Sequence, residues 1–208
     1  MPVRVITAPD PILTPASVAG SHAPDDPKIA ALIDAVTEEL DGPSGWLGRA
    51  LGPQTLELSL GGFGAKPIKL LYPPLIQITS VKYLDVLGVE QTVPDTVYRQ
   101  AGDRLVLKVG QAWPIAGCAP DAVRVQYRAG YDGTPASEGG TGKVPERVLQ
   151  AVILSVQNLV SIGAENLFLR SEEVNGVGTT TYTVSEVAGT IVREAAERLL
   201  GNLRVYAL

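Results

Sequence analysis

Few residues of this sequence have the chemistry that catalysis requires. The chain contains one histidine, His22, and one cysteine, Cys118. His22 lies in a proline-rich segment without a periodic apolar pattern, so we expect it to be exposed, not oriented as a general base must be. Cys118 stands between Gly117 and Ala119, without a basic neighbour that would favour the thiolate. Neither residue is therefore expected to act as a base or nucleophile.

The other candidate motifs are incomplete. Residues 139–143, GGTGK, are similar to the end of a phosphate-binding loop. The full motif needs glycine where Ser137 stands and serine or threonine where Val144 stands. The sequence contains no cluster of histidines and cysteines that could bind a metal ion. Glu172 and Glu173 are adjacent, and we interpret them as solvated side chains and not as a catalytic pair. We therefore expect no metal, no cofactor and no enzymatic activity, with a hydrolase as the alternative from another class.

The bulk composition is that of an ordinary globular chain. The 208 residues are 45% hydrophobic and 19% charged, with a formal net charge of −5. Proteins that hold DNA tightly usually present a basic patch, so only passing contact with DNA is expected. The first residues lack the apolar core of a signal peptide, and the longest uncharged stretch, 148–164, is too short and polar to span a bilayer. The sequence predicts a soluble protein made in the cytoplasm, with no membrane partner.

Apolar residues recur every three or four positions in three segments, which predicts helices near 27–41, 145–165 and 185–202. Asp25 or Asp26 can cap the first helix, ahead of Pro27. The acidic residues Glu38, Glu39 and Asp41 lie at its C-terminal end, which the helix dipole disfavours. We interpret that end as solvated, with a contact to a basic partner as the alternative.

Between the first two helices, residues 51–132 alternate apolar and polar side chains in short runs bounded by glycine and proline. This pattern is typical of an antiparallel β unit with one buried face. We therefore expect an α+β fold, in which a helical core (25–50 and 144–203) carries an inserted antiparallel β-rich subdomain at 51–132.

Three segments are expected outside this framework. Residues 1–24 carry five prolines and read as an extended N-terminal arm that grips a neighbour, with a disordered terminus as the alternative. Residues 171–183 are rich in serine, threonine and glycine, which indicates a flexible loop or a strand-like arm that orders against a partner. Residues 203–208 form a short apolar C-terminal tail, of the kind that usually docks onto something.

Candidate contact residues follow from this organisation. Four cations could share the outer face of the sheet, either as a solvated surface or as a docking face for acidic neighbours: Arg104, Lys108, Arg124 and Arg128. The last helix and the tail supply the other candidates for binding a partner: Arg193, Arg198, Leu203, Val205, Tyr206 and Leu208.

The order of several motifs is similar to that of a known family. An amphipathic helix is followed by RALGPQTLELSLGGF (Arg49 to Phe63) and LLYPPLIQITSVKYLDVLGVEQTV (Leu70 to Val93). GQAWP (Gly110 to Pro114), DAVRVQYRAGY (Asp121 to Tyr131) and VPERVLQAVILSVQNLV (Val144 to Val160) come next. In this order they resemble the head–tail connector proteins, or adaptors, of long-tailed phages and of phage-derived gene transfer agents. The likeness covers about residues 25–165.

The resemblance implies a structural subunit of a virion neck. Members of the family form a closed ring, commonly a dodecamer, beneath the portal protein. The ring carries the stopper, or head-completion protein, and packaged DNA passes through its channel. The resemblance thus implies that the chain binds itself, the portal and the stopper after synthesis in the bacterial host. The structural alternative is a β-rich tail or baseplate module, against which the long apolar helix at 145–162 argues.

Overall fold

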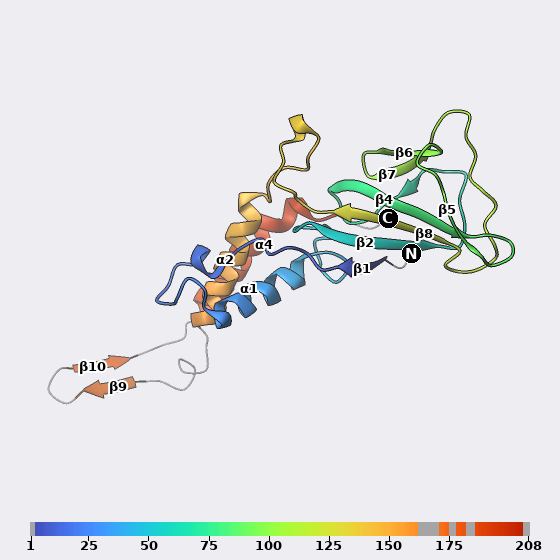
Figure 1. Cartoon of the computed structure of the whole chain (residues 1–208). Helices are drawn as coiled ribbons and strands as arrows, with labels where there is room; N and C mark the ends of the chain where they lie inside the picture. The colour runs from blue at the N-terminus through green and yellow to red at the C-terminus, as the bar shows by residue number, and fades with distance from the viewer. Residues whose placement is uncertain (1–2, 162–170, 175–177, 182–185, 206–208) are drawn as a thin grey trace. The chain divides into compact units, whose positions relative to one another are not determined.

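The computed structural model describes residues 3–161, 171–174, 178–181 and 186–205, which divide into two compact units. The β unit comprises Met1–Ile12, Leu40–Val144 and Arg204–Leu208, and the helical unit comprises Leu13–Glu39 and Pro145–Leu203. Helices and antiparallel sheets both contribute, so the predicted α+β class is confirmed (Figure 1).

The larger sheet of the β unit has five antiparallel strands in the order β1-β2-β8-β4-β5. Their bounds are Val3–Thr7 (β1), Gln54–Leu60 (β2), Val123–Ala129 (β8), Leu75–Leu84 (β4) and Glu90–Thr92 (β5). Successive side chains of a strand point to opposite faces. Leu56 and Leu58 on β2, and Val125 and Tyr127 on β8, are fully buried on one face. The opposite face of this sheet is called the outer face below.

Residues 3–7, at the start of the expected extended N-terminal arm, form a strand of the larger sheet. Val3–Thr7 form β1, which pairs with β2 so that Val3 lies opposite Leu58 and Val5 opposite Leu56. This stretch contains no proline, so each of its residues keeps a backbone N–H for the ladder. The strand therefore completes the sheet within its own chain.

A second sheet of three strands shares the core of the β unit. Its order is β3-β7-β6, with bounds Ile68–Lys69 (β3), Arg104–Leu107 (β7) and Tyr98–Ala101 (β6). Ile68 and Leu105 of this sheet belong to the same buried cluster as Leu56 and Tyr127 of the larger one. The two sheets thus bury their apolar faces together, which leaves the outer face for polar contacts.

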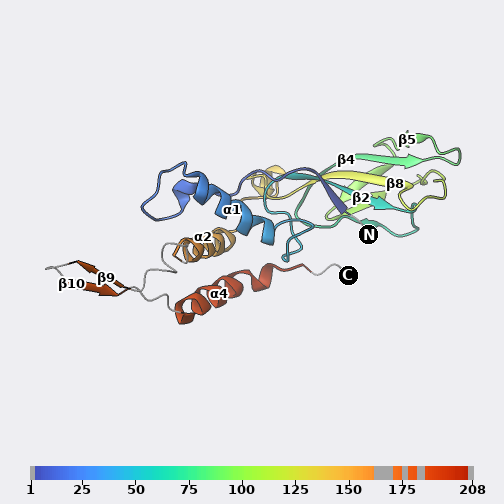
Figure 2. The same ribbon diagram turned by 90° about the horizontal axis from the view of Figure 1, so that it is seen from below.

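The helical unit contains α1 (Pro27–Leu40), α2 (Glu146–Ser161) and α4 (Glu186–Leu200), close to the three predicted helices. Asp26 caps α1, since its Oδ1 accepts from Lys28 N over 2.8 Å. α2 packs against α4 (Figure 2). The buried residues of the three helices include Ile29, Ile33, Val36, Val148, Ala151, Val152, Val156, Ala196 and Leu200.

Part of the segment at 171–183 has strand structure. β9 (Ser171–Val174) pairs in antiparallel fashion with β10 (Gly178–Thr181). Within the described residues, these two strands form a sheet of their own. A lone two-stranded hairpin is only marginally stable in water. These strands lie within the segment expected to be a flexible loop or a strand-like arm, and its ordering against a partner stays a prediction.

Candidate interaction surfaces

A hydrogen-bonded row crosses three strands on the outer face. Arg4 of β1 lies opposite Glu57 of β2, and Glu57 lies opposite Gln126 of β8. Arg4 Nε donates to Glu57 Oε1 over 2.9 Å, and Gln126 Nε2 donates to Glu57 Oε2 over 2.9 Å. Glu57 is 3% exposed, and a buried carboxylate is tolerated where both of its oxygens have donors. The row therefore supports one register for these strands.

A second charged group on the outer face joins β4, β5 and β8. Glu90 Oε1 accepts from Lys82 Nζ over 2.8 Å, and Glu90 Oε2 forms an ion pair with Arg124. The hydrogen bond from Lys82, together with the charges of Lys82 and Arg124, holds the pKa of Glu90 below its usual range. The carboxylate thus stays ionised and binds the short edge strand β5 to its neighbours.

The outer face carries an excess of positive charge. Besides the two groups above, it includes Arg128, which is exposed and lies on the same side of β8 as Arg124. Its charged residues are four cations and two carboxylates: Arg4, Lys82, Arg124, Arg128, Glu57 and Glu90. Two positive charges remain in excess, on a chain whose net charge is −5. The face is therefore suited to an acidic partner.

The four cations expected to share one face are divided between two sheets. Arg124 and Arg128 lie on the outer face, but Arg104 begins β7 in the three-stranded sheet, with its Nε 3.7 Å from Asp103 Oδ1. Lys108, just after β7, donates to a backbone carbonyl over 2.9 Å. The expectation of one four-residue patch is wrong, because alternation determines the face of a side chain within its strand but not the sheet that the strand joins.

Sequence reasoning missed several outer-face residues. Arg4 stands between Val3 and Val5, and Glu57 between Leu56 and Leu58, so the alternation already placed both side chains away from the core. The missing information was the pairing of β1 with β2, which no local pattern supplies.

The described part of the C-terminal tail lies against its own β unit. Val205 N donates to Leu47 O over 2.8 Å, and the guanidinium carbon of Arg204 lies 5.5 Å from the ring centroid of Trp46. Gly48 has a φ of +64°, and a Cβ there would come within 2.2 Å of Val205 O. Glycine is thus required where the tail passes.

The remaining candidate contact residues on the last helix and the tail differ in how exposed they are. Arg198 is exposed on α4 and can meet a partner directly. Leu203 is 9% exposed, so it is part of the folded chain and not an open contact. The side chain of Arg193, and Tyr206 and Leu208 as a whole, lie outside the described residues.

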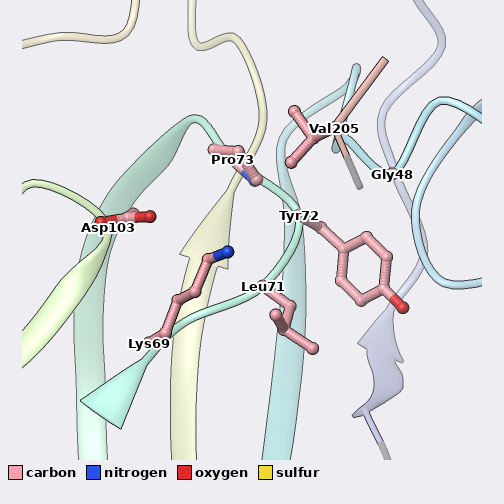
Figure 3. Close-up of a pocket in the computed structure, with 7 residues that line it drawn as sticks. All are labelled: Gly48, Lys69, Leu71, Tyr72, Pro73, Asp103 and Val205. Atoms are coloured by element: carbon pink, nitrogen blue, oxygen red, sulfur yellow. The ribbon is translucent and has the colours of Figure 1, made fainter. Parts of the chain in front are cut away.

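A small cavity of about 90 Å³ lies beside the tail (Figure 3). Its lining residues are Gly48, Lys69, Leu71, Tyr72, Pro73, Asp103 and Val205. Ligand pockets usually measure at least about 300 Å³, so this cavity has room for water and not for a cofactor. It marks where the tail and the β unit meet.

Asp41 forms a buried polar cluster at the end of α1. Its Oδ1 accepts from Leu51 N over 2.7 Å, and Gln54 Nε2 lies 2.9 and 3.0 Å from its two carboxyl oxygens. Asp41 is 5% exposed, whereas Glu38 and Glu39 are exposed. The interpretation of a solvated acidic end is therefore wrong for Asp41. Burial raises the pKa of Asp41 to about 6, although the hydrogen bonds from Leu51 and Gln54 oppose the shift.

The histidine and the cysteine are not brought together. His22 is half-buried, with Nε2 2.8 Å from Val18 O and Nδ1 3.0 Å from Ala23 O, which corrects the expectation of an exposed bystander. Cys118 is a free, exposed thiol. In the part of the chain that the structure describes, no group of three or more histidine, cysteine or acidic residues is placed to hold a metal ion. None of the helices described has the length and apolar character needed to cross a membrane.

Comparisons with known proteins identify structural neighbours but no sequence family. No family model matches the chain, and no curated protein matches it. A chain from the neck of a native GTA particle, computed with C12 symmetry, aligns with a TM-score of 0.63 and 16% identity. A chain from the virion of a native gene transfer agent (GTA) particle gives 0.64 and 16%, and one from the neck of an empty GTA particle, computed with C6 symmetry, gives 0.63 and 18%. Each alignment covers 100% of this chain and 97% of the other. The chain therefore has the fold of proteins found in gene transfer agent particles.

Proposed function

We propose that this chain is a structural subunit of the neck of a phage-like particle. In this proposal it is an adaptor, which forms a ring between the portal and the stopper and leaves a channel through which DNA passes. The observation that carries the proposal is the likeness, over the whole chain, to chains from gene transfer agent necks. Those necks were computed with C12 and C6 symmetry, which supports a ring.

The surfaces of the chain support the same function. A closed ring needs two different, complementary faces on each copy. The outer face presents exposed Arg128 among ion-paired neighbours, whereas the chain as a whole carries a net charge of −5. An acidic surface of the next copy, of the portal or of the stopper fits this face by charge. The neighbouring chains come from virions, which favours a structural role over an enzymatic one.

The charge pattern also suits a channel that DNA must leave. Three of the four outer-face cations have carboxylate partners within the face: Arg4 pairs with Glu57, and Lys82 and Arg124 pair with Glu90. Glu57 and Glu90 neutralise two of the four positive charges, so the face releases fewer counterions from DNA than four free cations would. We therefore expect DNA to pass without being held.

Assembly with the portal tests the proposal. The purified protein is mixed with its cognate portal, and the product is imaged by electron microscopy. We expect a ring stacked on the portal; portals without a ring, together with intact particles that lack the protein, would refute the adaptor function. A monomer in isolation is compatible with assembly that occurs on the portal.

A matched pair of variants tests the part played by the outer face. Arg128→Glu reverses an exposed charge on this face, and Arg99→Glu reverses an exposed charge on β6 in the other sheet. We expect Arg128→Glu to lower ring occupancy on the portal about tenfold, as the loss of about 1.4 kcal/mol would, and Arg99→Glu to leave it unchanged. Equal effects of the two variants on ring occupancy would show that the outer face is not part of the contact. They would not refute the formation of the ring.

A further inference from the structure

The turn between β4 and β5 displays three large aliphatic side chains to solvent. Val86 is 71% exposed, Leu87 84% and Val89 52%. These three residues are called the apolar tip. A cluster of exposed aliphatic residues is characteristic of a protein–protein contact, and the core of the β unit does not need them.

Hydrogen bonds to Asp85 hold the tip in one conformation. Its Oδ1 accepts from Leu87 N over 2.9 Å and from Val89 N over 3.0 Å, and its Oδ2 accepts from Gln91 Nε2 over 3.2 Å. Gly88 takes a φ of +79°, which permits the tight turn. The tip is therefore organised before any partner arrives, so little conformational entropy is lost on binding.

The helical unit offers a concave apolar surface. A groove of about 880 Å³ is lined by the start of α1, the end of α2 and the loop at 18–22. Ile29 and Leu32 of α1 line it, with Leu159 and Val160 of α2, which are 42% and 43% exposed. Like the tip, the groove therefore leaves aliphatic side chains in contact with solvent.

Three polar side chains that line the groove have partners within their own unit. Nε2 of His22 lies 2.8 Å from Val18 O, a distance at which this nitrogen can donate to the carbonyl. Asp26 caps α1, and Gln157 Nε2 donates to Ala19 O over 3.3 Å, which joins the loop to α2. An apolar insert that leaves these contacts in place would avoid the penalty for unpaired polar groups at these positions.

We propose that the apolar tip of one copy inserts into this groove on the next copy of the ring. The inference rests on the proposed ring, in which every copy must carry two different surfaces that fit each other. This chain carries a protruding apolar surface on its β unit and a concave one on its helical unit. A second copy is therefore the occupant for which a matching surface is present.

Cross-linking in portal-bound rings tests the contact. The exposed native thiol is first removed by Cys118→Ser. Leu87→Cys and Val160→Cys are then combined in one chain, and a short bis-maleimide is added to the assembled ring. We expect a ladder of linked copies on a denaturing gel. The control pairs Val160→Cys with Val109→Cys, an aliphatic position outside the tip that is fully exposed, and it should give no ladder above background.

A second pair of variants gives an independent readout. Leu87→Asp places a charge on the tip, and Val109→Asp places one at the control position; both side chains are exposed, so circular dichroism should show folded proteins. We expect about tenfold fewer rings per portal for Leu87→Asp and no change for Val109→Asp. Double-cysteine rings that form on the portal but give no ladder, or that are linked instead to the portal or within one chain, would overturn the inference but leave the adaptor function standing. Absence of any ring would overturn both.

Discussion

The buried carboxylate of Asp41 makes the stability of the β unit depend on pH in a direction that can be calculated. The pKa of Asp41 is raised from its ordinary value of 3.8 to about 6. The folded protein therefore holds this proton more tightly than the unfolded chain does. The stabilising contribution of the proton is complete below pH 3.8 and is lost as the pH rises through about 6. Asp41→Asn replaces the titrating group with a neutral one of the same shape.

The magnitude follows from the pKa difference. At 1.36 kcal/mol per pKa unit, a rise from 3.8 to about 6 corresponds to about 3 kcal/mol of unfolding free energy. The asparagine Oδ1 can still accept from Leu51 N, and its amide can donate to Gln54 once that side chain turns over. Part of this change falls below pH 4, so we expect the stability of Asp41→Asn, relative to wild type, to increase by about 2.4 kcal/mol between pH 4 and pH 7.5.

Urea denaturation at a series of pH values measures this difference. Both tryptophans, Trp46 and Trp113, lie in the β unit with Asp41, so their fluorescence reports the relevant transition. The control is Asp34→Asn, at an exposed position of α1, which should follow the wild-type pH profile. A difference between Asp41→Asn and wild type that is constant with pH, or that falls as the pH rises, would refute the reasoning.

Three further predictions concern other contacts of the β unit. Tyr127→Phe removes the hydroxyl that donates to Leu71 O over 2.9 Å and should lower the unfolding free energy by about 1 kcal/mol in urea melts; an unchanged midpoint would show that this bond adds nothing. Glu57→Ala should cost about 2 kcal/mol, because Glu57 accepts from two side chains on the outer face, and Glu57→Gln should cost clearly less; equal losses would contradict the hydrogen-bonded row. Gly48→Ala should release the tail, because the new Cβ would meet Val205 O. Faster cleavage after Arg204 in limited proteolysis would report that release, and an unchanged rate would contradict the tight approach.

The sequence was sufficient for features that depend on neighbouring residues. The spacings of three and four predicted α1, α2 and α4 to within a few residues, because the helical repeat is a local property. Alternation predicted the strands within 51–132 for the same reason. The scarcity of catalytic residues was equally visible, since one histidine and one cysteine are a matter of composition.

Only the tertiary structure decided which distant segments meet. Arg4 and Glu57 are 53 positions apart, and Gln126 is 69 from Glu57, so their row depends on strand pairing that no local repeat encodes. The same holds for the division of the four predicted cations between two sheets and for the docking of Val205 against Leu47. Asp41 shows the physical reason most clearly. Its position after α1 predicted that it would be solvated. In the folded chain Leu51 and Gln54 lie against its carboxylate, and burial raises its pKa. The sequence by itself determined the elements and the scarcity of histidine and cysteine, and the packing of remote segments determined which charges are buried, paired or exposed.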